Sequence, residues 1–131
     1  MKHNRFGIGK SVLWASKHEI GECQTSDLEK IINGRFSIYN KLIYWSSTEN
    51  EAFDNESNAA KWKDLAEDFD IVCGVFPPSA IIGLFIARAM EDEGKDDNLI
   101  RSGLKVYTPV SEIKFGIDGK KIFRFLRWQE I

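Results

Sequence analysis

The sequence predicts an α/β domain, Rossmann-like, with a mainly parallel sheet and a C-terminal antiparallel β-hairpin. Two short, largely apolar runs, at residues 12–15 and 70–76, are typical of strands covered on both faces. Segments of helical length separate these runs from the other strand-like segments. The resulting order, β-α-β-α-β-α-β followed by a hairpin, favours parallel strands joined by right-handed crossovers.

The first half of the chain predicts two helices and one further strand after the opening one. Thr25 or Ser26 is expected to cap a short helix that ends at the Asn-Gly pair of residues 33–34. β-Branched and aromatic residues over 36–47 then predict one strand, most secure over 41–46 after a bend at Asn40. A solvated acidic loop follows, and Ser57 is expected to cap the next helix.

The second half predicts an apolar helix, a short strand and a hairpin. Pro78 suits the first turn of a helix, and residues 79–90 are apolar nearly all round. Such a helix lies inside a domain or is covered by another subunit. A short strand is expected at 104–108, ending at Pro109. The Asp-Gly pair at 118–119 between two strand-like runs predicts a hairpin. The hairpin strands are expected at 113–117 and 120–128.

The length of 131 residues and the composition indicate a single globular domain. It is expected at 11–131, after a flexible lead-in at 1–10. A net charge of −2 gives no overall attraction to long nucleic acid or to anionic membranes. No apolar segment approaches the roughly 20 residues of a membrane span. The start lacks the apolar stretch of a signal peptide, so a cytoplasmic location is expected. Cys23 and Cys73 are too few for a disulfide framework, and Cys73 is expected in the core.

Polar residues follow the first predicted strand abruptly. Ser16, Lys17, His18 and Glu19 can donate, accept, carry charge or move a proton. Because the carboxyl ends of parallel strands share one edge of a sheet, the ends of later strands should contribute to the same crevice. The expected additions are Ser46, Ser47, Pro78, Ser79 and Thr108.

This collection suits an anionic ligand such as a phosphodiester. Lys17 would act as a point charge on phosphate, and His18 could transfer a proton near neutral pH. Ser16 and the other hydroxyls would fix position. Each residue also has an ordinary structural interpretation, as a solvated loop charge, a strand-ending turn or a strand-to-helix junction.

Familiar cofactor and metal motifs are missing from the chain. It has no GxGxxG after the first strand, no GxxxxGK[ST] and no HExxH. The two histidines and two cysteines are too scattered for a zinc site. We therefore expect neither a cofactor nor a metal.

The run LWASKHE (13–19), together with DIVCGVFPP (70–78) and the apolar helix after it, resembles small, largely uncharacterised phage and plasmid proteins. Their first strand ends in a Ser-Arg-His-Glu-like tetrad, and Lys17 stands where many of them carry Arg. The layout over 11–128 also resembles the small stand-alone relatives of the CARF domain, including CRISPR-associated ring nucleases. That likeness implies a homodimer that binds cyclic oligoadenylate at the carboxyl ends of the parallel strands.

The chemistry implied by this resemblance is metal-independent attack of a ribose 2′-hydroxyl on the adjacent phosphate. From chemistry and position, Lys17 would stabilise charge, His18 would carry the proton, and Ser16 and Ser79 would hold phosphate oxygens.

Two classes of function therefore stay open. The first is a homodimer, with the helix at 79–90 as its interface, that binds or cleaves a nucleotide-type ligand beside Ser16 to Glu19. The alternative is a phage- or plasmid-encoded protein–protein interaction module, for instance an inhibitor of a host protein, without catalysis. In that case exposed aromatic residues of the hairpin would matter, namely Phe123, Phe125 and Trp128.

Overall fold

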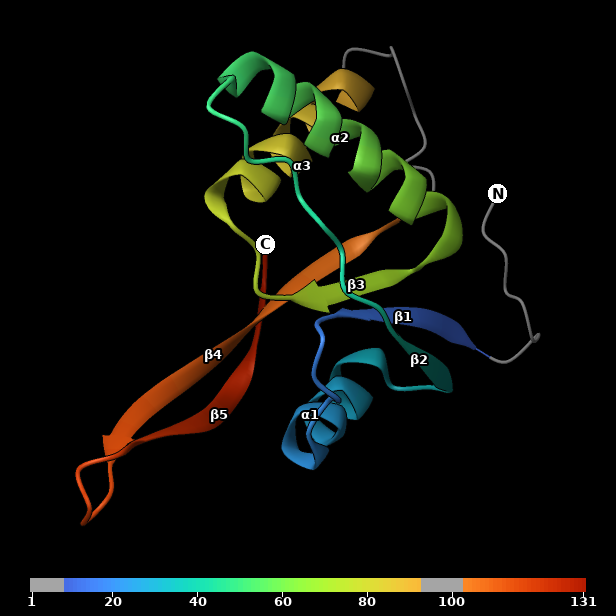
Figure 1. Ribbon diagram of the computed structural model, residues 1–131. Helices are drawn as coiled ribbons and strands as arrows, with labels where there is room; N and C mark the ends of the chain where they lie inside the picture. The colour runs from blue at the N-terminus through green and yellow to red at the C-terminus, as the bar shows by residue number, and fades with distance from the viewer. Residues whose placement is uncertain (1–8, 93–102) are drawn as a thin grey trace.

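The computed structural model describes residues 9–92 and 103–131 of the chain, and within them a five-stranded mixed sheet is flanked by helices (Figure 1). The α/β class expected from the sequence is confirmed. Most of the lead-in expected at 1–10 lies outside the described residues. In chain order the elements are β1 (Lys10–Ala15), α1 (Glu22–Ile32), β2 (Phe36–Asn40), α2 (Glu51–Asp68), β3 (Ile71–Gly74), α3 (Pro78–Asp92), β4 (Lys105–Phe115) and β5 (Lys121–Glu130).

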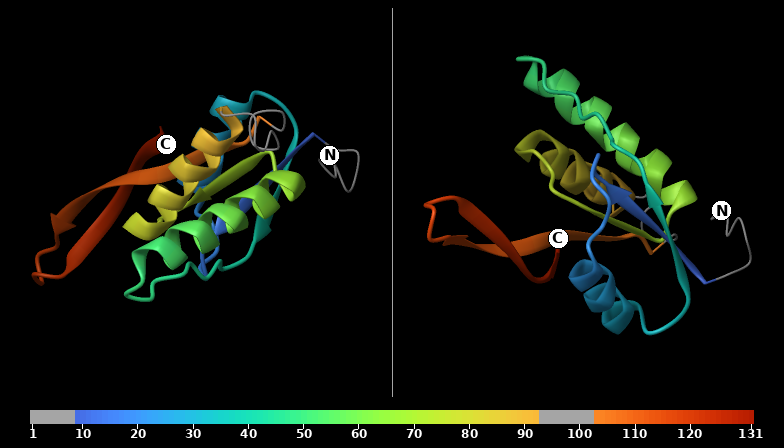
Figure 2. Two further views of the ribbon diagram at one scale, coloured as in Figure 1. Left: turned by 90° about the horizontal axis from the view of Figure 1, so that it is seen from above. Right: turned by 60° about the horizontal axis from the view of Figure 1, so that its bottom comes forward.

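The strand order is β2-β1-β3-β4-β5. The first four strands are parallel and β5 runs antiparallel to β4, which confirms a mainly parallel sheet with a C-terminal antiparallel hairpin. The chain leaves β1 toward β2 on one side and then returns to β3 on the other. Because crossovers of one hand must change face when their direction reverses, α1 covers one face of the sheet while α2 and α3 cover the other (Figure 2).

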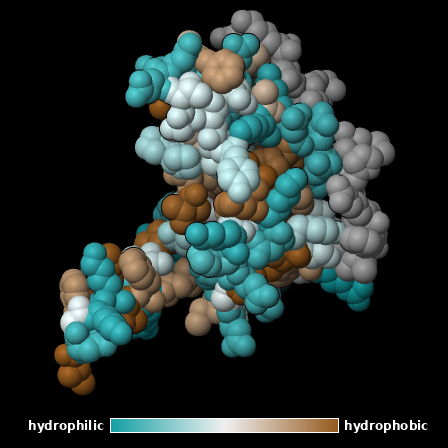
Figure 3. All heavy atoms as spheres, in the orientation of Figure 1, coloured by the Kyte–Doolittle hydropathy of each residue, from teal (hydrophilic) through white to brown (hydrophobic). Residues whose placement is uncertain are grey.

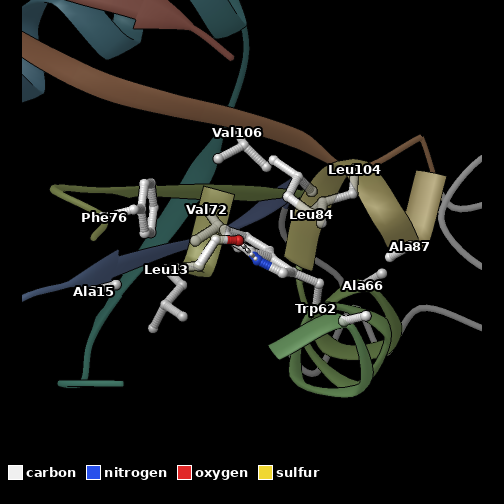
Figure 4. Close-up of a cluster of buried hydrophobic side chains, with 12 residues drawn as sticks. Leu13, Ala15, Trp62, Ala66, Val72, Phe76, Leu84, Ala87, Leu104 and Val106 are labelled. Atoms are coloured by element: carbon white, nitrogen blue, oxygen red, sulfur yellow. Dashed lines mark hydrogen bonds between the residues drawn. The ribbon is translucent and has the colours of Figure 1, made fainter. Parts of the chain in front are cut away.

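β1 is buried on both of its faces, as its unbroken apolar run predicts. Successive strand residues point to opposite faces, so Val12 and Trp14 join the core cluster under α1. Leu13 and Ala15 join the cluster under α2 and α3 (Figure 4). Cys73 is fully buried in the α1 cluster, as predicted, and its burial raises the pKa of the thiol to about 12.

Trp62 lies at the centre of the cluster under α2 and α3 and has no solvent exposure (Figure 4). Its indole Nε1 donates a hydrogen bond of 2.8 Å to the carbonyl oxygen of Ala80, so the buried polar group is satisfied. The two helices approach closely at Gly83, where an added Cβ would lie 2.7 Å from Cβ of Asn58 and 2.9 Å from the nitrogen of Ala59. Only glycine fits this contact.

The one strand predicted within 36–47 is present, but its extent is wrong: β2 spans Phe36–Asn40, and residues 41–50, which include the part expected to be most secure, form a loop. β1 pairs with β2 only from Lys10 to Trp14 because β1 itself ends at Ala15. The last main-chain contact is the hydrogen bond from the Lys41 N–H to the carbonyl oxygen of Trp14. Past that point the aromatic and branched residues have no neighbouring strand to pair with, whatever their β propensity.

Both helix starts expected in the first half are misplaced. α1 begins at Glu22 after Gly21, whose N–H donates to Oε1 of Gln24, rather than at Thr25 or Ser26. The left-handed Asn33 confirms the expected end of this helix.

The second helix, α2, begins about two turns earlier than a cap at Ser57 would place it, because the Asn50 side chain caps it by accepting the N–H of Phe53. Acidic Glu51 and Asp54 then occupy the first turn, where the helix dipole favours negative charge. Much of the expected acidic loop is therefore helical.

The two strand segments predicted at 104–108 and 113–117 form one strand, β4. Pro109 does not end it because the last pair between β3 and β4 joins Cys73 to Tyr107. Beyond that pair β4 has β5 as its single neighbour, where a residue without an N–H is tolerated. The predicted hairpin at Asp118 and Gly119 is confirmed, and Gly119 adopts a φ of +78°.

Two buried polar side chains of α2 hold the loop at 41–50. Asp54 accepts hydrogen bonds from Oγ of Ser46 at 2.7 Å, and from the N–H and Oγ1 of Thr48, both at 2.8 Å. Asn58 accepts the N–H of Ser46 at 2.7 Å and donates to its carbonyl oxygen at 3.0 Å. Burial would raise the pKa of Asp54, but the hydrogen bonds from Ser46 and Thr48 outweigh it and hold the pKa below its ordinary value.

Replacement of Gly83 by alanine should destabilise the domain. The new methyl group would overlap main-chain atoms of α2, and overpacking of this kind costs about 1–3 kcal/mol. Alanine gains up to about 1 kcal/mol of helix propensity, which reduces this cost. Urea unfolding measures the net effect, and Ala89→Gly on the exposed side of α3 measures the propensity contribution alone. A Gly83→Ala protein more stable than the wild type would contradict the close approach of the helices.

Asp54→Asn should lower the melting temperature at neutral pH, because an amide cannot accept all of the hydrogen bonds that the carboxylate accepts. The folded-state pKa lies below the ordinary value of 3.8, so the carboxylate stabilises the fold above pH 3.8. That contribution is lost as the pH falls through the lower, folded-state value.

The gap in melting temperature between wild type and Asp54→Asn should therefore be constant near neutrality and narrow below about pH 3.8. Asp64→Asn, at an exposed position of the same helix, is the control and should show little change. Equal melting temperatures for the wild type and Asp54→Asn at pH 7 would show that the buried network contributes nothing.

Candidate functional site

A cleft with a volume of about 600 Å³ lies at the carboxyl end of β1. All four residues of the predicted tetrad line it, together with residues that follow β2 and β3 and one from β4. The lining residues are Trp14, Ala15, Ser16, Lys17, His18, Glu19, Gln24, Leu42, Val75 and Pro109. The tetrad therefore lies beside residues that follow the neighbouring strands, but these are not the residues that were expected there.

The tetrad is held by a buried tryptophan. Trp14 is 6% exposed, and its indole Nε1 donates a hydrogen bond of 2.7 Å to the carbonyl oxygen of His18. Asn40, the last residue of β2, donates to the same oxygen at 3.0 Å. The N–H of His18 donates to Oγ of Ser16 at 3.1 Å, which closes the turn. The main chain of the turn is thus fixed from the core, while the side chains of Lys17, His18 and Glu19 are exposed.

The cleft combines a lysine side chain with apolar walls. Within residues 9–92 and 103–131, the ammonium of Lys17 has no carboxylate partner. Leu42 and Val75 are exposed beside it, with 39% and 73% of their surfaces accessible. Pro109 adds a rigid apolar surface from β4. A cation next to exposed apolar side chains suits a ligand that has both an anionic and a flat apolar part.

Five of the predicted site residues do not line the cleft. Ser46 is hydrogen-bonded to α2, and Ser47 is exposed in the same loop. Pro78 and Ser79 begin α3, which covers the face of the sheet opposite to α1. Ser79 Oγ is buried without a hydrogen-bond partner among the described residues. Thr108 follows Tyr107, which faces α1, so alternation along β4 directs Thr108 to the other face.

Six lining residues were not predicted as site residues, namely Trp14, Ala15, Gln24, Leu42, Val75 and Pro109. Val75 directly follows β3, three residues before Pro78, and Pro109 lies within β4 on the face opposite Thr108. Because side chains alternate along a strand, following the face of Trp14 across the neighbouring strands could have identified Pro109. Leu42 was assigned to a strand, and nothing in the sequence indicates that Gln24 of the first helical turn reaches the cleft.

No metal-binding group is evident in the described part of the chain, where no three His, Cys, Asp or Glu side chains gather closely enough to hold an ion. Of the helices that the structure describes, none has the length and apolar character to cross a membrane. Comparison of the chain with protein-family models, with curated proteins and with solved structures found no significant match. The assignment of the cleft therefore rests on its own geometry and chemistry.

Proposed function

We propose that this protein binds a small nucleotide-type ligand in the cleft beside Ser16 to Glu19. The observation that carries the proposal is the convergence of the whole tetrad with apolar residues from three other segments on one cleft. Its volume, about 600 Å³, lies within the range of about 300–1,000 Å³ typical of small-molecule sites. The cleft also lies next to the reversal of strand order between β1 and β3, where Rossmann-like sheets bind their ligands.

The polar side of the cleft matches the sugar and phosphate of a nucleotide. The unpaired ammonium of Lys17 would contact a phosphate oxygen. Ser16 Oγ already accepts the N–H of His18, so its hydroxyl hydrogen is free to donate to a second phosphate oxygen. The carboxylate of Glu19 repels phosphate, and it would instead accept hydrogen bonds from ribose hydroxyls, as acidic residues do in dinucleotide sites.

The apolar side of the cleft matches a nucleobase. Leu42, Val75 and Pro109 present side chains with little or no hydrogen-bonding capacity, against which a planar base would pack. Gln24 lines the same cleft, and its amide could read donors and acceptors at the edge of the base. A single cleft of this size suits a mononucleotide or dinucleotide, whereas a cyclic oligoadenylate would extend over the clefts of two copies.

A thermal-shift screen with mono-, di- and cyclic oligonucleotides tests the proposal. A ligand that binds the folded state should raise the melting temperature in a concentration-dependent way. Lys17→Ala should lower the affinity for the ligand with the largest shift by about tenfold or more, as expected for loss of a charge-assisted hydrogen bond. Lys30→Ala, on α1 outside the cleft, is the matched control. No shift with any nucleotide, or an equal loss in both variants, would contradict the proposal.

His18→Ala separates binding from cleavage. The substitution retains the main-chain carbonyl that Trp14 and Asn40 hold, so the turn should persist and affinity should fall only a few-fold. In cleavage, the ribose 2′-hydroxyl would give up its proton to a base as its oxygen bonds to phosphorus, the bond from phosphorus to the 5′-oxygen would break, and the departing 5′-oxygen would gain a proton from an acid.

If the wild type forms such a 2′,3′-cyclic phosphate, the rate in His18→Ala should fall about 10²–10⁴-fold, the usual contribution of a general acid or base. Chromatography of the products and ligand titration measure the two quantities separately. Unchanged cleavage would exclude proton transfer by His18, and collapse of binding would make it a positioning residue.

A further inference from the structure

The far part of the β4–β5 hairpin, residues 109–128, projects from the body of the domain in every view and is called the arm below (Figures 1 and 2). β3 pairs with β4 only as far as Cys73 and Tyr107. From Pro109 onward the arm is therefore a ribbon of two strands, and among residues 9–92 and 103–131 no third strand and no helix lies beside most of its length. Isolated two-stranded ribbons are marginally stable in water.

The two faces of the arm differ sharply. Directly paired residues share a face, and the pairs Ile113 with Phe123 and Ser111 with Phe125 lie on the same side as Phe115. We call Ile113, Phe115, Phe123 and Phe125 the apolar arm face. The opposite face carries Glu112, which forms ion pairs of 3.4 Å with both Lys114 and Arg124, and one exposed apolar residue, Ile122.

The apolar arm face is uncovered. Ile113, Phe115 and Phe123 are 52%, 69% and 68% exposed, and hydrophobic atoms are visible along the arm in Figure 3. The face is continuous with the core, because the ring of Phe125 lies 5.4 Å from that of Trp128, a member of the cluster under α1. A contiguous exposed face of this kind marks an interaction surface.

The arm is basic, whereas the rest of the chain is acidic. Residues 111–128 contain five Lys or Arg and two Asp or Glu, a net charge of +3, whereas the whole chain carries −2 and the remainder therefore −5. At the tip, Lys120 and Lys121 have no ion-pair partner within the described residues. At the base, a groove of about 390 Å³ between α1 and β5 is lined by two acids, Glu22 and Asp27, by one cation, Lys30, and by Phe125.

We propose that the apolar arm face packs against the same face of a second copy of this chain, with the two arms antiparallel about a two-fold axis. From Phe125 to Gly119 the arm extends about 20 Å, at roughly 3.3 Å per residue. Two overlapping antiparallel arms then bring the lysine tip of each copy to the acidic groove of the other. A two-fold arrangement makes each such contact twice.

The charges favour a second copy over nucleic acid as the occupant. Three of the five arm cations already have partners on the hairpin: Lys114 and Arg124 share Glu112, and Arg127 donates to the amide oxygen of Gln129. The surface left without a partner is chiefly apolar, which an identical apolar ribbon covers and a phosphate backbone does not.

Sedimentation of the full chain over a range of concentrations tests the proposal. The wild type should form a dimer that dissociates on dilution, and the double variant Phe115→Thr/Phe123→Thr should be monomeric at the same concentrations. Threonine retains strand propensity, and circular dichroism checks that the fold persists. The matched control is Phe85→Thr, which removes a phenyl ring of similar exposure (53%) from α3. It should leave the dimer intact.

A charge exchange tests the antiparallel arrangement independently. Lys121→Glu or Glu22→Lys alone should weaken the dimer by about tenfold or more at low salt, and the two together should restore it. Three results would overturn the proposal: a wild type that is monomeric at every concentration, dissociation by Phe85→Thr instead of the arm variant, or a charge pair that fails to restore the dimer. A monomer whose arm variants lose binding to oligonucleotides would assign the arm to nucleic acid.

Discussion

The hydrogen bond from the Trp14 indole to the carbonyl oxygen of His18 links the core of this protein to its cleft. An indole as buried as that of Trp14 must find an acceptor, because an unsatisfied N–H in the interior costs about 1–3 kcal/mol. The chain supplies that acceptor four residues later, which forces residues 16–18 to turn back over the end of β1. The position of Lys17 and His18 is therefore a consequence of core packing, which gives the cleft a rigid rim.

A second buried polar network has a corresponding role on the other side of the sheet. After Asn40 the chain must pass from the edge strand β2 to α2 without a strand to pair with. Asp54 accepts hydrogen bonds from Ser46 and Thr48, and Asn58 accepts the N–H of Ser46. These bonds fix the loop at the end nearer to α2. The end of the loop nearer to β2 contributes Leu42 to the wall of the cleft.

Much of the fold could be predicted because its signals are local. The apolar run of β1, the Asp-Gly turn and Pro78 at a helix start each act within a few residues. The extent of the strand expected within 36–47 was wrong because propensity does not reveal how far a neighbouring strand extends. The same limitation applies to the site. The tetrad follows from one strand end, whereas identifying Val75 and Pro109 requires the faces and lengths of three strands together.

The unequal lengths of β3 and β4 account for both surface features of this protein. β3 has four residues and β4 has eleven, although the two strands begin in register at Ile71 and Lys105. β1 and β3 stop together, at the paired residues Ala15 and Gly74, whereas β4 runs on, and Val75 and Pro109 line the cleft at these strand ends. Where β4 continues alone with β5, the ribbon leaves the domain and exposes an apolar face. Lengthening β3 would extend the sheet across the cleft and cover one edge of the arm, so the proposed ligand site and the proposed dimer contact share one structural cause.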